Sequence, residues 1–322
     1  MNKLLTIAIP TYNRAKLLEQ QLTWLAKAIK GFESECEIII SDNCSTDNTQ
    51  EVIKKWQQNL SNTNFIANRN TENIGVMKNI AYCINAATSK YLWTIGDDDP
   101  IEINALGYVL ENLKQYPELS LLILNFSCRS AETGQLIYNR CFNVDNEEVY
   151  ADGKALFEYC LEENHAGVGF MTAQVYRTQL VQSALKKWSS GLNNMEAQVY
   201  WTAFCAAYGS AKVTKETYVQ NAFGVSYWMR EPKVLLKMQY IDLPALYVKL
   251  IEIGYSNKFC RKLVLQHFLK NNWRVFLGSL RRWPILAITT IIPYLGLVSV
   301  SAWQMILPSR LKLERSSNDA MT

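Results

Sequence analysis

The sequence predicts an α/β protein with a largely parallel sheet, followed by a helical C-terminal region. Two observations support the sheet. Short apolar runs alternate with stretches of helical spacing through the first 126 residues. The helical stretches are about 10–15 residues long, the usual length of crossovers between parallel strands. Beyond residue 230 the pattern is helical almost to the end.

The first 126 residues contain five expected strands: Leu4–Ile9, Glu37–Ser41, Asn64–Asn68, Tyr91–Gly96 and Leu119–Phe126. Four stretches between them are expected helices: Arg14–Ile29, Asn48–Leu60, Gly75–Ala87 and Glu102–Gln115. In the first helix Leu18, Leu22 and Leu25 form an apolar stripe. This order of elements predicts βαβ units.

From residue 127 to 230 the pattern is less regular. The expected elements are a hairpin-like strand at Gln135–Val144, a helix at Asp152–Glu163, a strand at Gly169–Tyr176 and a helix at Glu196–Tyr208. Gly209 follows the last of these in a C-cap position. Because no repeat or low-complexity linker intervenes, we expect one domain over 1–230, with halves 1–126 and 127–230, and a helical region over 231–322.

The composition, 49% hydrophobic and 19% charged, is that of a globular protein slightly rich in apolar residues. A net charge of +4 is too small to indicate a nucleic-acid partner, and we expect none. Two histidines exclude a histidine-rich metal site. Eight scattered cysteines without a Cys-x-x-Cys pair favour reduced thiols in a cytosolic protein. The chain enters a strand at once, so no signal peptide is expected.

Three carboxylates, Asp97, Asp98 and Asp99, follow the strand that ends at Gly96. They repel one another and are costly to hold together unless a cation or ligand neutralises them. Gly96 allows the backbone to turn, and Pro100 ends the strand. Ligands bind at the carboxyl ends of strands in open α/β sheets, which favours a site here. The alternative is an acidic surface turn.

Four motifs occur in order at the ends of strands or the start of a helix: Ile7–Arg14, Ile38–Thr49, Asn70–Asn79 and Ile95–Asp99. Each is common alone, but the four together, in this order and spacing, closely resemble family 2 glycosyltransferases of the GT-A fold. These are inverting enzymes that use nucleotide-activated sugars. The resemblance covers residues 4–130 well and 190–225 more weakly.

The resemblance implies that Asp99 is the main ligand of Mg²⁺ or Mn²⁺, and that Asp98 faces the metal or the ribose. Such hard cations prefer carboxylate oxygens and phosphates. Asp97 is implied only as a donor-binding residue. Gly96 departs from the commoner Asp-x-Asp-Asp spelling, because it stands where the first acid would be.

Donor-binding residues implied by the resemblance lie in all four motifs: Pro10, Thr11, Tyr12, Arg14, Asp42, Gly75, Asn79, Asp97 and Asp98. Asp42 would bind the base or ribose, or else belong to a helix-capping turn. Tyr12 has a core position as its alternative, and Arg14 either approaches a phosphate or simply starts a helix. Gly75 would bring a helix N-terminus to the nucleotide, or serve close packing.

Glu196 is the implied catalytic base, since the family supplies a Glu-Asp pair at the start of a late helix. The pair is broken here, because Met195 and Ala197 flank the single acid. Its alternative role is a first-turn acid favoured by the helix dipole. His165 is the rival base, although a lone loop histidine is more often a surface residue.

The segment Trp283–Pro308 contains no charged residue and is long enough to span a bilayer. Basic residues flank it: Arg281, Arg282, Arg310, Lys312 and Arg315. Pro293 in its middle and tryptophans near its ends favour a helix lying at the membrane interface. The helix Lys258–Leu280 would share this contact. A buried helical hairpin is the alternative.

The chain therefore resembles bacterial transferases that extend polyprenyl-diphosphate-linked oligosaccharides for O-antigen or other surface polysaccharides. This implies a nucleotide-sugar donor, a lipid-linked acceptor, and a peripheral location on the cytoplasmic face of the inner membrane. The Gly-Asp-Asp-Asp spelling also resembles the abequosyltransferase-like branch. One alternative is a nucleotidyltransferase, although Pro10–Arg14 lacks the glycine-rich loop expected for a triphosphate. The other is an inactive glycan-binding or scaffold relative, supported only by the broken acid pair.

Overall fold

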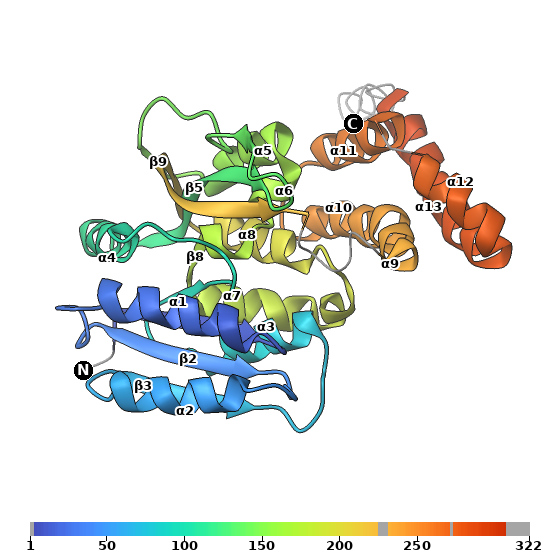
Figure 1. Ribbon diagram of the computed structural model, residues 1–322. Helices are drawn as coiled ribbons and strands as arrows, with labels where there is room; N and C mark the ends of the chain where they lie inside the picture. The colour runs from blue at the N-terminus through green and yellow to red at the C-terminus, as the bar shows by residue number, and fades with distance from the viewer. Residues whose placement is uncertain (1–2, 225–230, 271–272, 307–322) are drawn as a thin grey trace. The chain divides into compact units, whose positions relative to one another are not determined.

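The computed structural model describes residues 3–224, 231–270 and 273–306 (Figure 1). Contacts divide the chain into two compact units, Met1–Val225 and Ser226–Thr322. Within the described residues the first unit contains a mixed sheet with helices on both faces, and the second is helical.

The sheet of the first unit has nine strands, with bounds β1 Leu5–Thr11, β2 Cys36–Asp42, β3 Asn64–Arg69, β4 Tyr91–Thr94, β5 Leu119–Ser130, β6 Leu136–Tyr138, β7 Val149–Tyr150, β8 Gln174–Arg177 and β9 Ser210–Phe223. Their order is β3-β2-β1-β4-β8-β5-β9-β7, and β6 pairs with β5. The first four are mutually parallel neighbours, and β5 is parallel to β9. β8 runs antiparallel to both β4 and β5. The predicted mostly parallel α/β sheet is confirmed.

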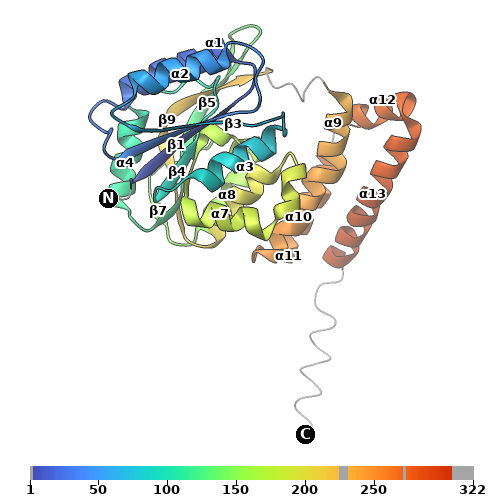
Figure 2. The same cartoon turned by 90° about the horizontal axis from the view of Figure 1, so that it is seen from below.

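Helices cover both faces of this sheet (Figure 2). α1 (Ala15–Ala28) and α2 (Thr49–Asn59) lie on one face, and α4 (Ala105–Gln115) contacts α1. The other face carries α3 (Val76–Ala86), α7 (Thr178–Lys187) and α8 (Ala197–Ala207), and α5 (Gly153–Glu163) packs on α8. The predicted stripe of α1 is buried, as are the residues of β2 and all those of β1 except the half-buried Pro10. Because β1, β2 and β4 are parallel, their carboxyl ends lie at the same edge of the sheet.

The region after residue 127 differs from the prediction in its details. The hairpin-like strand is only the short β6, and the expected strand at Gly169–Tyr176 begins later, at β8, after a 3₁₀ turn over Met171–Ala173. The long strand β9 was not predicted. Its polar residues break the apolar pattern, and its register against β5 shifts three times, so no simple alternation marks it.

The described part of the second unit contains α9 Pro232–Lys237, a π-helix η4 Met238–Asp242, α10 Leu243–Glu252, α11 Asn257–Lys270, α12 Arg274–Arg282 and α13 Pro284–Ile306. Two helices, α11 and α12, thus occupy the stretch expected as the single helix Lys258–Leu280. The ring of Tyr240 contacts the rings of Trp273 and Tyr294 in the core of this unit. The Tyr294 hydroxyl also lies 2.8 Å from His267 Nδ1.

Helix α13 is apolar but largely uncovered. Among the described residues, Pro284–Met305 is the one helix long and apolar enough to cross a membrane, with mean hydropathy 2.0 and 33% of its window buried. Ile285, Ile292 and Trp303 are 79%, 61% and 65% exposed. The predicted basic flank beyond Pro308, at Arg310, Lys312 and Arg315, lies outside the described residues.

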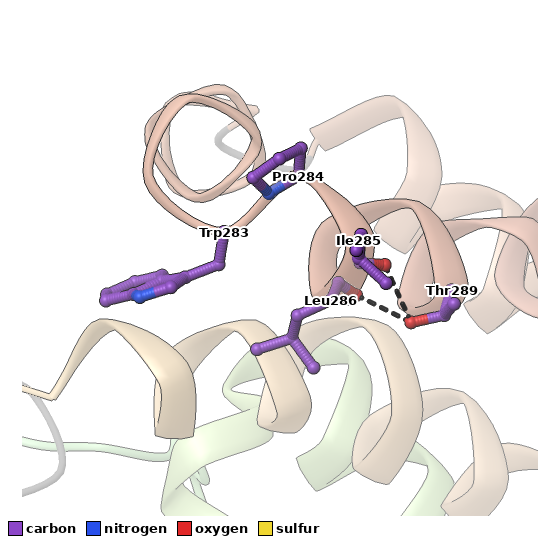
Figure 3. A pocket seen from close by; sticks show the side chains of 5 residues that line it. All are labelled: Trp283, Pro284, Ile285, Leu286 and Thr289. Carbon is purple, nitrogen blue, oxygen red and sulfur yellow. Dashed lines mark hydrogen bonds between the residues drawn. The ribbon is translucent and has the colours of Figure 1, made fainter.

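An open cavity of about 450 Å³ lies at the start of α13, lined by Trp283, Pro284, Ile285, Leu286 and Thr289 (Figure 3). The Thr289 hydroxyl lies within hydrogen-bond distance of the carbonyls of Ile285 and Leu286, so its polar atom is satisfied inside the helix. The face around the cavity is therefore apolar. Lys233 lies over the ring of Trp283, at 5.0 Å from its centroid.

All eight cysteines are free thiols, as predicted. Cys44, in the loop after β2, is half-buried, and the other seven are buried. Burial raises the pKa of Cys36 and Cys83 to about 12, so these thiols stay protonated and inert at neutral pH.

Candidate functional site

The first element of the candidate site is an ion-pair cluster where β1 and β4 end. Thr11 is the last residue of β1, and its hydroxyl donates to Asp97 Oδ2 at 2.7 Å. Arg14 Nη1 donates to Asp97 Oδ1 at 2.9 Å and to Asp98 Oδ2 at 2.7 Å. Asp97 is buried, whereas Asp98 and Arg14 are half-buried. Asp97 therefore anchors the loop after β1, and Asp98 is the more accessible carboxylate.

Charge in this cluster is not balanced. Burial opposes the charge of Arg14, but Asp97 and Asp98 outweigh it and raise the pKa of the guanidinium. Burial raises the pKa of Asp97, against the effect of Arg14. Burial, together with the charges of Asp98 and Asp97, raises the pKa of Asp99 to about 7. One arginine faces three carboxylates, so this cluster favours an added positive charge.

Asp99 is buried and turned back toward the sheet. Its Oδ2 accepts a hydrogen bond from the Thr172 hydroxyl. Thr172 Oγ1 accepts in turn from the backbone N–H of Gly96, at 2.8 Å. The Thr172 carbonyl accepts from the indole N–H of Trp93, also at 2.8 Å. Thr172 was not among the predicted site residues, because nothing in the local sequence links it to the Asp triplet.

The carboxylates of the Asp triplet suit a divalent cation that is also bound by phosphates, rather than a cation enclosed by protein ligands alone. Within residues 3–224, 231–270 and 273–306, no group of three or more His, Cys, Asp or Glu is arranged to hold a metal ion. Mg²⁺ usually takes only one or two carboxylates, and phosphate oxygens or waters complete its shell. Asp98 and Asp99 supply two carboxylates beside an excess of negative charge, which meets that need.

Asp42 ends β2 and is fully enclosed, with 0% of its surface exposed. Its Oδ1 accepts from the backbone N–H of Ser45, and its Oδ2 accepts from Gln50 at 2.6 Å. Arg69 Nε lies 3.7 Å from the same Oδ2 and is itself exposed. Asp42 therefore holds the loop after β2 and orients an exposed guanidinium. Gln50 and Arg69 were not predicted as site residues.

The loops after β1 and β2 are tied together. Asn13 (φ 52°) and Cys44 (φ 66°) both adopt left-handed backbone conformations, which are uncommon for residues other than glycine. The Asn13 side chain accepts from the Thr46 backbone N–H at 2.7 Å, and the Asn13 N–H donates to the Ser45 hydroxyl at 2.8 Å. Strained residues of this kind cluster at functional sites.

A network of side-chain amides holds the N-terminal part of α3 against β2. Asn79 is buried, and its Oδ1 accepts from the Ser41 hydroxyl and from Asn70 Nδ2. Asn79 Nδ2 donates to the Ser41 carbonyl. Gly75 caps the helix with φ 86° and ψ 157°, a conformation open only to glycine. Asn79 thus joins α3 to β2, and Gly75 allows the sharp entry.

Pro10 and Tyr12 flank Thr11 at the same edge. Pro10 is half-buried and lies beside Ser41 in the parallel register of β1 with β2. Tyr12 is exposed, so the alternative of a core tyrosine is wrong for this residue.

Glu196 and His165, the two candidate bases, lie side by side. Glu196 is the N-cap residue of α8, and its backbone N–H donates to the Asn194 side chain at 2.7 Å. Its Oε2 lies 3.3 Å from His165 Nε2, on the short helix α6 (His165–Val168). Both side chains are half-buried. The Thr202 hydroxyl, on α8, donates to the Val168 carbonyl and so joins the two helices.

One segment, 165–172, carries both His165 and Thr172. Its beginning contacts Glu196 and its end contacts Asp99. Glu196 and Asp99 are thereby in contact with the two ends of the same short segment.

Comparison with known proteins gives a consistent picture. Residues 6–171 match the protein family Glycosyl transferase family 2. Abequosyltransferase RfbV of Salmonella typhimurium is 35% identical over 131 residues, which are 41% of this chain and 37% of that protein. The GalNAc(5)-diNAcBac-PP-undecaprenol beta-1,3-glucosyltransferase of Campylobacter jejuni is 28% identical over 115 residues, 34% of this chain and 35% of that protein. The matches thus span little more than a third of either relative.

The fold has solved counterparts. The crystal structure of S. aureus TarS 1–349 in complex with UDP-GlcNAc aligns with a TM-score of 0.67 and 16% identity. The alignment covers 92% of this chain and 81% of that one. At this identity the likeness concerns the fold, and it confirms the predicted GT-A architecture.

Proposed function

Since the chain belongs to glycosyl transferase family 2 and is a glycosyltransferase, we propose that it is a metal-dependent inverting enzyme. Its donor is a nucleotide-activated sugar, and its acceptor is a polyprenyl-diphosphate-linked oligosaccharide of a bacterial surface polysaccharide such as O-antigen. One observation carries the proposal: the loops after β1 and β4 meet at one sheet edge, where Thr11 binds Asp97 and Arg14 binds both Asp97 and Asp98.

In the proposed donor site, the half 1–126 binds the nucleotide sugar. The exposed ring of Tyr12 and the half-buried Pro10 offer contact surface beside Thr11. The enclosed Asp42 contributes by holding its loop and Arg69, whose half-exposed guanidinium would approach an anionic or base group. Gly75 and Asn79 fix the N-terminus of α3 at the same edge, where backbone N–H groups favour negative charge.

Asp98 and Asp99 are the proposed ligands of Mg²⁺ or Mn²⁺. A divalent cation bound there, together with the diphosphate, would neutralise the charge that builds up on the departing nucleoside diphosphate. Arg14 would keep Asp98 in place through its hydrogen bond of 2.7 Å and add a positive charge near the phosphates.

Glu196 is the proposed base. Its carboxylate would accept the proton of an acceptor hydroxyl while that oxygen attacks the anomeric carbon from the face opposite the diphosphate. A carbon–oxygen bond forms to the acceptor, the bond to the diphosphate oxygen breaks, and the configuration inverts. The neighbouring His165 would hold the carboxylate in position through the contact of 3.3 Å.

The proposed acceptor lies at a membrane. Support comes from the uncovered apolar face of α13, with Arg281 and Arg282 in the last turn of the helix before it. The name of the Campylobacter jejuni relative includes an undecaprenol-linked saccharide, which supports a lipid-linked acceptor for this chain. We therefore propose peripheral attachment to the cytoplasmic face of the inner membrane.

The two alternatives have less support. Family membership favours sugar transfer over nucleotide transfer. An inactive relative would have no need for a carboxylate at the start of α8 beside a histidine, yet Glu196 and His165 are in contact.

The proposal is tested by thermal stabilisation with UDP, GDP, CDP and dTDP, each with and without Mn²⁺. A ligand that binds only the folded state stabilises it by about 2.7 kcal/mol at a hundredfold excess over Kd. We expect one nucleotide to stabilise the protein strongly only with Mn²⁺, and Asp99→Ala to abolish this metal dependence. Asp152→Ala, which removes the N-cap of α5, serves as control and should retain it. A wild type unaffected by all four nucleotides would contradict the proposal.

A further inference from the structure

Gly96, Asp99 and Thr172 form a closed hydrogen-bonded unit. Thr172 Oγ1 accepts the Gly96 N–H at 2.8 Å and donates its own proton to Asp99 Oδ2. A hydroxyl has one proton, and because the Gly96 N–H already occupies an acceptor position, that proton is directed at the carboxylate. Thr172 is fully buried, and the Trp93 indole fixes its carbonyl. The hydroxyl is therefore held in a single arrangement.

The sheet topology explains this meeting of distant residues. β8 is antiparallel to β4, with Trp93 opposite Val175. Gly96 lies three residues after Trp93, and Thr172 lies three residues before Val175. The residue that precedes the reversed strand must therefore lie beside the residue that follows β4. If β8 were parallel to β4, the residues that follow β8 would lie beside Gly96, rather than the residues that precede it.

Gly96 provides the space that Asp99 uses. A Cβ at position 96 would lie 2.4 Å from Asp99 Oδ2 and 3.1 Å from its Cγ. Any side chain at this position would displace the carboxylate from Thr172. The commoner motif of the family has an acid at this position. Here glycine replaces that acid, and the Asp99 carboxylate turns back over the glycine.

We propose that Thr172 is a positioning residue for the metal site, with Gly96 as the position that permits it. The inference rests on the proposed role of Asp99 as a metal ligand. By taking Oδ2, the Thr172 hydroxyl would restrict rotation of the carboxylate and leave Oδ1 available to bind the cation. Outer-shell partners of this kind typically change metal affinity about 10–100-fold when removed.

The test measures Mn²⁺ binding by the electron paramagnetic resonance signal of free Mn²⁺. The full chain is used with whichever of UDP, GDP, CDP or dTDP stabilises the wild type most. Thr172→Val should weaken Mn²⁺ binding about 10-fold or more, whereas Thr172→Ser, which keeps the hydroxyl, should stay within about 2-fold of wild type. Nucleotide binding without metal should be unchanged in both.

Two further variants sharpen the result. Thr94→Val is the matched control, because Thr94 is a buried threonine on β4 whose hydroxyl makes no hydrogen bond within the described residues. It should leave the Mn²⁺ affinity unchanged. Gly96→Ala should weaken Mn²⁺ binding as Thr172→Val does, and it provides the test if Thr172→Val does not fold.

The two proposals fail in different ways. If Asp99→Ala binds Mn²⁺ as the wild type does, the proposed metal ligand is wrong. If Asp99→Ala loses binding while Thr172→Val and Gly96→Ala both bind as the wild type, the positioning role alone is overturned.

Discussion

At the residue scale, the contact between Glu196 and His165 raises the question of which group takes the proton. The carboxylate is held at the N-cap of α8 and the imidazole on α6, so each is positioned by a separate element. A base must reach the acceptor hydroxyl itself, whereas a positioning residue acts only through its partner. Substituting each residue in turn separates the two roles.

Glu196→Gln should lower kcat by about 10²–10⁴-fold, the usual contribution of general base catalysis. Nucleotide binding should be unchanged, since the carboxylate acts on the acceptor. His165→Gln should have a smaller effect on kcat, because Gln can still hydrogen-bond Glu196. Glu163→Gln, which changes a carboxylate in contact with the Asn143 backbone, is the control. Steady-state transfer kinetics decide the matter: a larger loss in His165→Gln than in Glu196→Gln would make His165 the base.

A second residue-scale feature is a buried cation. Lys212 is buried on β9, donates to Asn112 at 2.7 Å and lies 3.3 Å from Glu147 Oε2. Glu147 also accepts hydrogen bonds from the Tyr108 hydroxyl and the Lys215 N–H. Burial would raise the pKa of Glu147, but these hydrogen bonds and the Lys212 charge outweigh it and lower the pKa.

Because the pKa of Glu147 is lower in the folded state, its stabilisation is present above the unfolded pKa and is lost as pH falls through the folded pKa. Glu147→Gln should therefore reduce the free energy of unfolding by about 1–3 kcal/mol at pH 7. The deficit should shrink steadily once the pH falls below about 4, near the unfolded pKa. Urea unfolding at several pH values measures this, with the adjacent exposed Glu148→Gln as control. An equal deficit at all pH values would contradict the assignment.

At the element scale, the direction of β8 determines what surrounds the Asp triplet. An apolar run predicts a strand but not its neighbours or its direction, so the contact of Thr172 with Asp99 could not be predicted. The alternating elements up to β5 could be predicted, because each helix carries a local stripe such as Leu18, Leu22 and Leu25. β9 could not, because its polar positions include the buried Lys212.

The exposed apolar face of α13 is the other element with a testable consequence. We expect the protein to float with vesicles containing anionic lipid, and Ile285→Glu/Ile292→Glu to reduce this binding at least about tenfold. Burying one isoleucine side chain contributes roughly 1.5–3 kcal/mol, so two losses should be easily measured. The control is Ile103→Glu, which changes an isoleucine of the first unit that is 56% exposed. If the double variant floats as well as wild type, α13 is not the membrane contact.

At the scale of the whole molecule, the chain consists of two compact units, Met1–Val225 and Ser226–Thr322. The positions of Asp98, Asp99 and Arg14 at a sheet edge followed from motif order and strand ends. The enclosure of Asp42 did not follow, since it depends on Gln50 and Arg69 closing over the carboxylate. The pairing of Glu196 with His165 depends on the packing of α6 against α8, which no local pattern records.

Because most of the cysteines are buried, thiol labelling can report local opening of the fold without any substitution. Cys44 alone is partly accessible, so a thiol reagent should label one site, in the loop between β2 and α2. Each buried cysteine then becomes reactive only when its surroundings open. Cys36 reports on β2 and Cys260 on α11 of the second unit. The order in which the remaining thiols react would rank the local stabilities of both units in the unmodified sequence.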